Sequence, residues 1–479
     1  MKRFFIIAIL FAFTFTSFSQ SLGYQDLGIL FSQNDNNGSA RFTAMSGAFG
    51  ALGGDISSIN VNPAGLSVFN NSTFTGSLNA RNSEITSIYG DPQLSRNSIT
   101  TQNQFINLSQ AGAVLVFDSA FSSDWAKFAI GFNYRITKDF NDSFFAEGNN
   151  GNATFIEFPL NDNEEALEYS IADKQGFNSN FTGDLSEFNI AFSSVYQDKL
   201  HVGVSLNFYD LDFGQQATLS EFNSDRDANE LDAFLYQENF TTGTGFSANF
   251  GFIYKVHQNF RFGLSYQTPT WFTEVIENSN ITANEGNRIN GTPFFGDTEI
   301  LVSNDNLIYD NTSGGFFPSQ SLTYRFKTPS TLTASTAIIF GKIGLLSIDY
   351  SNKSYERMKI SGDDFSNENQ FFQSDLKNTH NFNVGTEWRL DRFSIRGGYK
   401  FEQTPNTTLG LENNSIVNFT DIEGYSFGGG YNFGNFKVDF AYSNNNRTAT
   451  YGFYSGFNDS TADLSLDNSV FTTSISLSL

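Results

Sequence analysis

The sequence contains no cysteine, and proline and methionine are scarce, with 8 and 3 copies among 479 residues. Without cysteine the fold cannot rest on disulfides, which agrees with an exported protein but does not by itself define a compartment. Positive charge is scarce as well: 27 lysines and arginines stand against 50 acidic residues, for a formal net charge of −23. Because nucleic-acid binding depends on cations that neutralise phosphates, we expect no nucleic-acid partner.

Long hydrophobic runs are missing except at the N-terminus. There, Lys2 and Arg3 precede an apolar run that begins at Phe4, and the small residues Ser17 and Ser19 follow it. This order is typical of a secretory signal peptide, which we predict to cover residues 1–19. No later run approaches the ~20 consecutive apolar residues that a membrane-spanning helix needs. We therefore expect no transmembrane helix in the mature chain.

Aromatic residues, in contrast, are abundant, with 56 Phe and 19 Tyr. They follow an alternating pattern instead of forming runs. In residues 245–257, GFSANFGFIYKVH, most large apolar side chains fall at every second position, separated by polar or small residues. A period of two is typical of a β-strand with one face in an apolar medium and the other in a wetter one.

This alternation predicts fourteen strands. They cover residues 72–82, 108–118, 126–138, 185–196, 200–213, 245–256, 259–268, 329–340, 343–352, 378–390, 393–403, 422–432, 435–444 and 468–479. The connections after even-numbered strands are short, whereas those after odd-numbered strands are long, polar and acidic. Such strict alternation places every long loop at one end of the sheet.

An even number of antiparallel strands with loops sorted in this way is the layout of an outer-membrane β-barrel. A closed barrel can span lipid because it leaves no strand edge unpaired. We predict an all-β, 14-stranded antiparallel transmembrane β-barrel: a monomer in the outer membrane of a Gram-negative cell, surrounded by its lipids, with both termini periplasmic. The alternative is a soluble sandwich or propeller, but a sandwich does not require sorted loops, and no blade-length repeat is visible.

The end of the chain supports the barrel. In residues 468–479, NSVFTTSISLSL, apolar and polar residues alternate to the last position. This pattern resembles the C-terminal signal by which the barrel-assembly machinery recognises its substrates, with Leu479 in place of the more usual aromatic residue. We therefore expect that machinery to be a partner during insertion.

Motifs for catalysis or metal binding are weak. Residues 424–428, GYSFG, match the G-x-S-x-G nucleophile elbow, but the elbow needs a strand-to-helix turn, and here the strand pattern continues through Ser426. The acidic residues in 225–232 lack the glycine and closing glutamate of a calcium loop. The histidines show no metal-ligand spacing: His201, His257 and His380. We expect no enzyme activity, no metal and no cofactor.

Charged residues at predicted inward positions of the later strands are open to two interpretations. They are Glu387, Arg389, Arg396, Lys400, Glu402, Lys437 and Asp439. Cross-strand pairing that holds the wall is one. The other is that a cation, such as Arg396 or the separately placed Arg261, contacts an anionic ligand head group.

Aromatic pairs occur in the predicted long loops: Phe294 with Phe295, Phe316 with Phe317, and Phe371 with Phe372. Exposed apolar patches of this kind commonly mark an interaction surface or a ligand groove. The alternative is that the pairs pack the loops against each other.

Residues 40–69, ARFTAMSGAFGALGGDISSINVNPAGLSVF, precede the first predicted strand. This segment resembles the N-terminal hatch of the FadL family of outer-membrane transport proteins. The likeness rests on Arg41, the small-residue run from Ala44 to Ala51, Asp55, and the Asn62-Pro63-Ala64 motif. The strand count and the loop alternation match the same family. The resemblance implies a signal peptide over residues 1–19, a hatch inside the lumen over 20–70 and a barrel over 71–479.

The resemblance also implies roles for particular residues. Asn62, Pro63, Ala64 and Gly65 would form the hinge between hatch and wall, and Arg41 and Asp55 would be further gating residues, with Asp55 paired to a lumen cation. In the family, the ligand leaves through a lateral gap at a kink of the third strand. Gly131 offers a flexible point in that strand, which contains no proline.

The function implied by the resemblance is passive uptake of hydrophobic small molecules, such as long-chain fatty acids or aromatic hydrocarbons. Two alternatives from other classes stay open. One is a FadL-like barrel that acts as a carrier or scaffold in type IX protein secretion. The other is an outer-membrane enzyme such as a lipase, which would need Ser426.

Overall fold

The structure is a computed structural model that describes residues 22–118, 124–153, 155–158, 167–227, 230–289, 292–294, 299–302, 307–310, 320–362, 365–407, 415–452 and 461–479. The predicted signal peptide lies outside these residues, as do Phe295, Phe316 and Phe317. Among the described residues, no helix is both long and apolar enough to cross a membrane.

The elements follow one another in a strand-rich order. They are α1 (Tyr24–Phe31), α2 (Ala40–Ala44), η1 (Ile56–Asn60), η2 (Pro63–Val68), β1 (Thr73–Tyr89), β2 (Ser95–Asp118), β3 (Trp125–Asp139), β4 (Asp142–Asn149), β5 (Phe155–Phe158), β6 (Leu167–Glu168), β7 (Ile171–Tyr196), β8 (Leu200–Ser224), β9 (Glu230–His257), β10 (Phe260–Gln267), β11 (Trp271–Ile289), β12 (Thr292–Phe294), β13 (Glu299–Val302), β14 (Leu307–Asp310), β15 (Gln320–Lys327), β16 (Thr331–Phe340), β17 (Gly344–Lys353), η3 (Tyr355–Arg357), β18 (Lys359–Ser361), α3 (Ser366–Ser374), β19 (Thr379–Leu390), β20 (Phe393–Glu402), β21 (Val417–Phe419), β22 (Ile422–Asn432), β23 (Phe436–Tyr451) and β24 (Ala462–Ser478).

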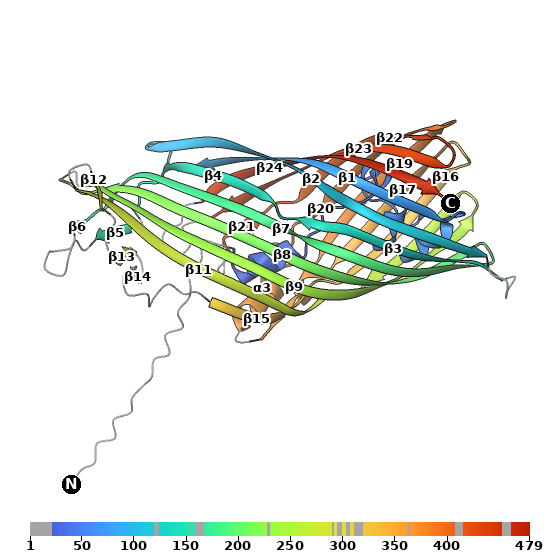
Figure 1. The fold of residues 1–479 in the computed structure, drawn as a ribbon, viewed down its shortest axis with the longest axis horizontal. Helices are drawn as coiled ribbons and strands as arrows, with labels where there is room; N and C mark the ends of the chain where they lie inside the picture. Colours follow the sequence, from blue (N-terminus) through green and yellow to red (C-terminus); the bar gives the residue numbers. More distant parts are fainter. Residues whose placement is uncertain are drawn as a thin grey trace, which may run out of the picture.

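Fourteen antiparallel wall strands close into one barrel (Figure 1). Successive wall strands pair with each other, and β1 also pairs with β24, which completes the ring. Five wall strands consist of two elements each: β3 with β4, β10 with β11, β15 with β16, β17 with β18, and β21 with β22. The predicted fold class and strand number are thereby confirmed.

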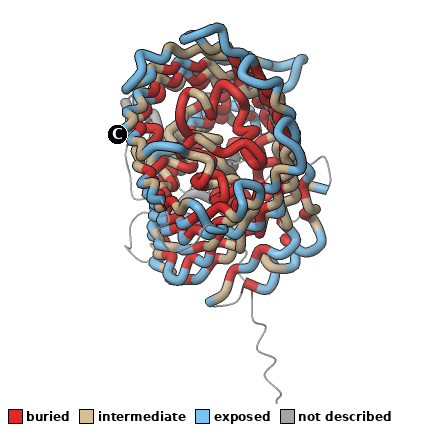
Figure 2. Tube along the Cα trace, turned by 90° about the vertical axis from the view of Figure 1, so that its right-hand side faces the viewer, coloured by how far each residue is buried: buried red, intermediate tan, exposed pale blue. Residues whose placement is uncertain are grey.

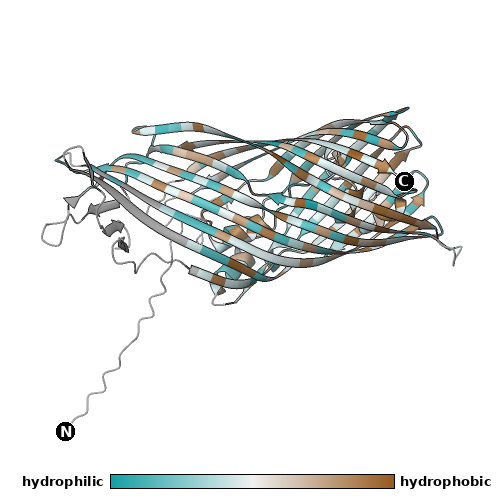
Figure 3. Cartoon of the chain, viewed as in Figure 1, coloured by the Kyte–Doolittle hydropathy of each residue, from teal (hydrophilic) through white to brown (hydrophobic). Residues whose placement is uncertain are grey.

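The wall turns apolar side chains outward and polar ones toward the lumen. In β8, Val204, Leu206 and Phe208 are about half exposed, whereas the alternate residues Ser205 and Asn207 are buried. Hydrophobic residues gather on the strands in the half of the barrel around the C-terminus (Figure 3). This is the half of the short turns, which we call the short-turn end; the opposite end is the long-loop end. The predicted alternation is confirmed for the strand ends near the short turns.

Several strands run well past their predicted ends toward the long loops. The segments predicted as long loops after the first and fifth strands instead form the hairpins β1–β2 and β8–β9, and these two loop predictions are wrong. In β8 the apolar positions switch from the outward residues Leu206 and Phe208 to the buried residues Leu211, Phe213 and Leu219. A prediction that looks for one continuous apolar face therefore ends the strand where this switch begins.

Two neighbouring wall strands are interrupted by proline. Pro269 separates β10 from β11, and Pro329 separates β15 from β16. Proline has no N–H to donate to a strand ladder. The backbone N–H groups next to the two prolines find partners in each other's segment. Thr328 N–H donates to the Thr270 carbonyl (3.0 Å), and Thr270 N–H donates to Thr328 Oγ1 (2.8 Å).

Residues 22–70, the hatch segment, lie inside the barrel (Figure 2). Their short helices begin at polar caps: Ser39 accepts from Phe42 N–H, Asp55 from Ser57 N–H, and Asn62 from Ala64 N–H. Such caps satisfy N–H groups that a helix start leaves unpaired. Ala40 N–H donates to Ser474 Oγ of β24 (2.6 Å), and Ser474 in turn bonds Ser77 Oγ of β1 (2.7 Å).

A ring of wall glycines leaves room for the hatch segment. A Cβ at Gly385 would lie 2.6 Å from the Met45 carbonyl oxygen, one at Gly131 would lie 2.8 Å from Leu66, and one at Gly203 would overlap the Ala64 backbone. We call this set the glycine collar; it comprises Gly112, Gly131, Gly203, Gly251, Gly263, Gly385, Gly398 and Gly428. Glycine fits these positions because backbone or side-chain atoms of the hatch segment approach too closely for a further side chain.

Candidate functional site

The third wall strand separates from its neighbour β2. β2 pairs with β3 from Gln110 to Asp118, and with β4 only at Ser95 and Arg96. In between, residues 97–109 and 136–147, which the structure describes completely, have no ladder pairing with each other, although each keeps its other neighbour. None of residues 91–108 is buried. We call this opening in the hydrogen-bonded wall the β2–β4 gap.

The gap arises where the strand breaks at Phe140 and Asn141. The register with β7 shifts just before the break. Beyond it, β4 lies against the inner side of β1: Ser83 Oγ donates to Asp142 Oδ2 (2.7 Å) and Ser87 Oγ donates to the Phe145 carbonyl (2.6 Å). The strand therefore bends toward the lumen and away from β2.

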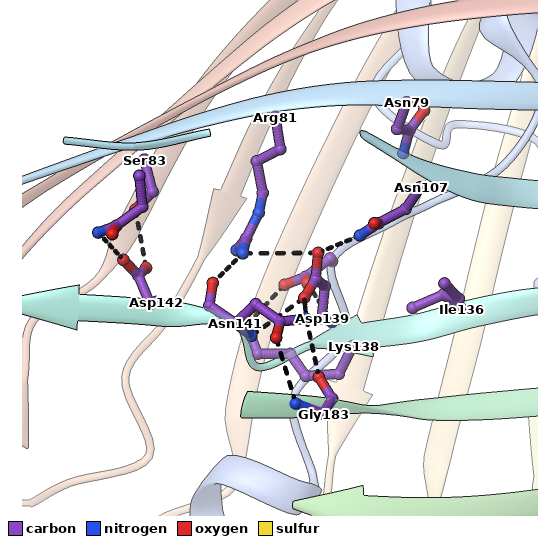
Figure 4. Close-up of polar contacts among 12 residues, drawn as sticks. Asn79, Arg81, Ser83, Asn107, Ile136, Lys138, Asp139, Asn141, Asp142 and Gly183 are labelled. Carbon is purple, nitrogen blue, oxygen red and sulfur yellow. Dashed lines mark hydrogen bonds and ion pairs between the residues drawn. The ribbon is translucent and has the colours of Figure 1, made fainter. Parts of the chain in front are cut away.

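Side chains bridge the gap in place of the missing backbone ladder. Asn107 of β2 donates to Asp139, which also faces Arg81 at 3.5 Å (Figure 4). Farther along, Asn103 Nδ2 donates to Asp142 Oδ1 (2.9 Å), and Ser143 Oγ donates to Asn103 Oδ1 (2.7 Å). Side-chain bridges of this kind can part without breaking either strand's remaining ladder.

A cavity of about 170 Å³ lies directly behind the gap. Its apolar lining comes from the hatch segment, from both sides of the gap and from the wall strands on either side of them, and includes Leu22, Ile85, Phe144, Phe213, Val417 and Leu464. Asn107, Asp139 and Phe140 line it as well, so the gap residues are part of its wall. A cavity of about 150 Å³ is large enough to hold a benzene-sized molecule. We call it the apolar cavity.

Most of the charged groups that line the apolar cavity are paired. Lys138 Nζ lies 2.6 Å from Asp35 Oδ1, and Lys400 Nζ lies 3.3 Å from Glu402 Oε2. Arg447 differs: its guanidinium lies 3.8 Å from the centre of the Phe419 ring and donates to Gln33 Oε1 (3.3 Å), and no carboxylate of the described residues forms an ion pair with it. The cavity thus combines an apolar surface with one guanidinium group that forms no ion pair among the described residues.

Asp26 of α1 also lines the apolar cavity. Burial raises the pKa of Asp26 to about 6, against the opposing effect of hydrogen bonds from Ser415 Oγ (2.6 Å) and Ile416 N–H (3.0 Å). Its hydrogen bonds connect the hatch segment to the chain that precedes β21.

Near the short-turn end, ion pairs hold the hatch segment to the wall. Arg41 Nε of α2 lies 2.7 Å from Glu387 Oε2 of β19, and Glu387 also pairs with Arg389 and Arg396, each at 2.7 Å. Arg396 Nη1 reaches Asp439 Oδ1 (2.6 Å). Arg41 further donates to the Gly54 carbonyl (3.1 Å), so one side chain binds both wall and hatch.

The other predicted hatch residues are buried. Asp55 accepts from Ser39 Oγ (2.7 Å) and Ser57 N–H (3.0 Å), and forms no ion pair among the described residues. Asn62 donates to the Gly50 carbonyl (2.8 Å) and to the Phe252 carbonyl of β9 (3.0 Å). Ala64 packs on the glycine collar, and Gly65 lies against Gly53; a Cβ at Gly53 would lie 2.6 Å from Gly65 Cα. Pro63 is buried as the first residue of η2.

The predicted ligand-contacting cations lie elsewhere than the apolar cavity. Arg261 donates to the Leu52 carbonyl (2.9 Å), and Arg396 is held between Glu387 and Asp439. Both line a second cavity, at the short-turn end. Gly131 pairs regularly with Val114 and Ala191 and belongs to the glycine collar, while the strand breaks at Phe140 and Asn141.

Other residues noted in the sequence have structural contacts. Phe371 and Phe372 are buried in α3, where Phe372 packs against Gly28 of α1, so this pair joins the outer loop to the hatch segment. Phe294 is the last residue of β12. Ser426 Oγ lies 2.8 Å from Ser46 Oγ, within a continuous strand. His201 Nδ1 lies 2.7 Å from Ser67 Oγ of the hatch segment.

Reasoning from the sequence missed the residues that bridge the gap, Asn103, Asn107, Asp139 and Asp142, and it missed Arg447. A signal was present in residues 135–142, RITKDFND, where four charged residues occur at the end of the predicted third strand and just beyond it. Charge is unfavourable on a lipid-facing surface. The density of charge therefore pointed to a strand that leaves the lipid-facing wall.

Comparisons with known proteins agree with this architecture. The family described as outer membrane protein transport protein (OMPP1/FadL/TodX) matches residues 29–450. The crystal structure of a Pseudomonas aeruginosa FadL homologue is similar with a TM-score of 0.56 and 12% identity, over 92% of this chain and 98% of that one. The Pseudomonas putida toluene transporter TodX is similar with a TM-score of 0.51 and 15% identity, over 93% and 99%.

No match was found among curated protein sequences. At 12–15% identity the solved structures support the fold alone, whereas the family match covers most of the chain. The chain therefore belongs to the FadL/TodX family of outer-membrane transport proteins.

Proposed function

We propose that this protein is a passive outer-membrane channel for hydrophobic small molecules, in the class of long-chain fatty acids and aromatic hydrocarbons. The long-loop end faces the outside, both termini face the periplasm, and the solute leaves sideways into the membrane through the β2–β4 gap. The observation that carries this proposal is that the apolar cavity lies directly behind the gap and shares residues with it.

The path follows from the physical chemistry of the solute. Transfer of an apolar molecule out of water is favourable, on the order of 25 cal/mol per Å² of apolar surface buried. The apolar cavity offers such a surface, and the lipid beyond the gap offers a larger one. Transfer is then downhill and needs no energy source. Arg447 provides a contact for an anionic head group at the edge of the cavity.

The hatch segment closes the direct route. It is held by the Arg41–Glu387 ion pair and fits closely against the glycine collar. With the straight path through the lumen occupied, the gap is the remaining exit from the apolar cavity. In this proposal, residues 20–70 therefore act as a plug that keeps ions out while apolar solutes pass sideways.

The lateral exit can be tested with a disulfide across the gap. The chain has no cysteine of its own, so an engineered pair is unambiguous. Asn103→Cys with Ser143→Cys joins β2 to β4 at a point where the side chains already contact each other. Thr86→Cys with Thr100→Cys is the matched control, because it joins β1 to β2, which are already paired, through hydroxyls 2.8 Å apart.

Uptake of radiolabelled oleate and toluene by cells that express each variant is the measurement. Oxidation of the gap pair is expected to reduce uptake to that of cells lacking the protein, and a reductant is expected to restore it. The control pair should transport equally in both states. Unchanged uptake in the oxidised gap pair would contradict a lateral exit. A carrier role in type IX secretion requires neither cavity nor gap, and predicts no uptake in any variant.

A further inference from the structure

A second, larger cavity of about 610 Å³ lies between the hatch segment and the short-turn ends of the wall strands. Its floor comes from Ser39, Arg41 and residues 52–56 and 68–70 of the hatch segment, with Asn71 beside them. Its sides come from nine wall strands and their turns, among them β10, β19, β20 and β23. It lies inside the wall, on the other side of the hatch segment from the apolar cavity. We call it the short-turn cavity.

Positive charge gathers in the short-turn cavity although the chain as a whole is acidic. Six cations line it: Arg41, Arg261, Arg389, Arg392, Arg396 and Lys437. Four carboxylates line it as well: Asp55, Glu387, Asp391 and Asp439. Six of the 27 lysines and arginines of the chain thus meet in one place, with a local surplus of two positive charges.

Half of these cations form no ion pair with a carboxylate of the described residues. Glu387 is shared by Arg41, Arg389 and Arg396, and Asp439 is taken by Arg396. Arg261, Arg392 and Lys437 form no ion pair within the part of the chain that the structure describes. Arg261 Nε is, in addition, a buried donor with no hydrogen-bond partner among the residues that the structure describes. A buried unpaired donor is unfavourable unless something accepts its hydrogen bond.

We propose that the short-turn cavity binds a small soluble anion that carries several carboxylate or phosphate groups. Arg261, Arg392 and Lys437 supply charge-assisted hydrogen bonds, and guanidinium groups suit carboxylate and phosphate geometry in particular. Lipid head groups are not candidates, because the closed wall separates this cavity from the bilayer. The anion enters from the aqueous space at the short-turn end.

Binding there has a consequence for the hatch segment. Lys437 lies close enough to Arg41 and Arg389 to interact with their charges. An anion bound beside Lys437 therefore competes with Glu387 for Arg41, which is the residue that joins hatch and wall. The same contact that holds the hatch segment becomes sensitive to solutes at the short-turn end.

Calorimetric titration of the mature protein in detergent micelles, with inorganic pyrophosphate and separately with citrate, tests the proposal. At low salt we expect saturable binding of both anions that weakens as NaCl is raised, because the interaction is between charges. The double variant Arg392→Gln and Lys437→Gln, which removes no recorded ion pair, is expected to bind at least tenfold more weakly. The control is Lys199→Gln with Lys342→Gln, which removes two charges from turns at the same end and outside the cavity lining.

The proposal is overturned if neither anion binds. It is also overturned if the affinity falls equally in the cavity variant and in the control variant. Binding lost only in the cavity variant supports it. The proposal is independent of the lateral exit: the cavity variant should take up oleate and toluene as the unmodified protein does. A failure of anion binding and a failure of apolar transport are therefore separate results.

Discussion

At the scale of single residues, Glu387 stands out because three arginines surround one buried carboxylate. Arg41 comes from the hatch segment, Arg396 from the neighbouring strand β20 and Arg389 from the same strand as Glu387, and the Glu387 side chain is only 1% exposed. Removing one partner of a buried pair leaves an uncompensated charge and typically destabilises by ~3–5 kcal/mol. The position of each arginine decides how much its loss matters.

We predict a graded series of stability losses around this carboxylate. Glu387→Gln should be the most destabilising, since it leaves three arginines without their anion. Arg41→Gln should come next, because Glu387 keeps two partners, and Arg389→Gln should matter least, with a side chain 49% exposed. Urea unfolding in lipid vesicles, followed by tryptophan fluorescence, measures the order. Equal losses from all three variants would contradict the view that Arg41 is the link to the hatch segment.

The raised pKa of Asp26 predicts that the stability of the hatch segment depends on pH. Its pKa of about 6 lies above the ordinary value of 3.8, so the folded state favours the protonated form, by ~3 kcal/mol. This contribution is fully present below about pH 4 and is lost as the pH rises through 6. The protonated group fits the site, because Ser415 Oγ can turn its hydrogen to the Val417 carbonyl at 3.0 Å and accept from Asp26 instead.

Amide hydrogen exchange in α1 checks this dependence. Protection factors over residues 24–31 are expected to be higher at pH 5 than at pH 8. Asp26→Asn, which is neutral throughout, should remove the difference. A variant that keeps the difference would show that another group is responsible.

At the scale of elements, the fit between hatch segment and wall depends on the glycine collar. Eight glycines from different strands face backbone or side-chain atoms of residues 44–66. Interiors are packed as densely as organic crystals, so even one added methyl group must displace its neighbour. The collar thus defines where the hatch segment sits along the barrel axis.

Gly203→Ala should displace the hatch segment at Ala64 and raise the ion conductance of the barrel in planar bilayers. Gly397→Ala is the matched control, since a Cβ there would have its nearest neighbour 3.8 Å away. Both variants should retain the heat-dependent gel migration of a closed barrel. Native conductance in Gly203→Ala would contradict a sealing role for this contact.

The third wall strand shows how much of the structure could be predicted from the sequence. Its residues 126–138 alternate clearly, and β3 was predicted almost to its ends, whereas β4 lies in a segment that was predicted to be a long loop. The break at Phe140 and Asn141 was not predicted. The charges in residues 135–142 indicate a strand that leaves the lipid-facing wall, but the pairing that is lost depends on the path of β2, which no local pattern in the third strand indicates. Gly131 drew attention as a flexible residue, whereas its role in the structure is to let Leu66 approach the wall.

At the scale of the whole molecule, the barrel could be predicted because lipid imposes one rule on every strand. Outward residues must be apolar and backbone groups must pair, so alternation and loop length suffice to count the strands. The apolar cavity follows no such rule. Leu22, Phe213 and Leu464, which line it, come from three distant parts of the chain and meet only through the closure of the ring. Arg261 and Arg396 were recognised as inward cations, but their distance from that cavity depends on the position of the hatch segment.

The contact between Ala40 and Ser474 has a consequence for the order of assembly. Ser474 lies on β24, the last strand of the chain, and bonds both Ser77 of β1 and the backbone of the hatch segment. The pairing of β24 with β1 is the step that closes the ring. The hatch segment precedes β1 in the chain and is available before that step. We therefore expect the ring to close around residues 22–70, with its final seam formed against the backbone at Ala40.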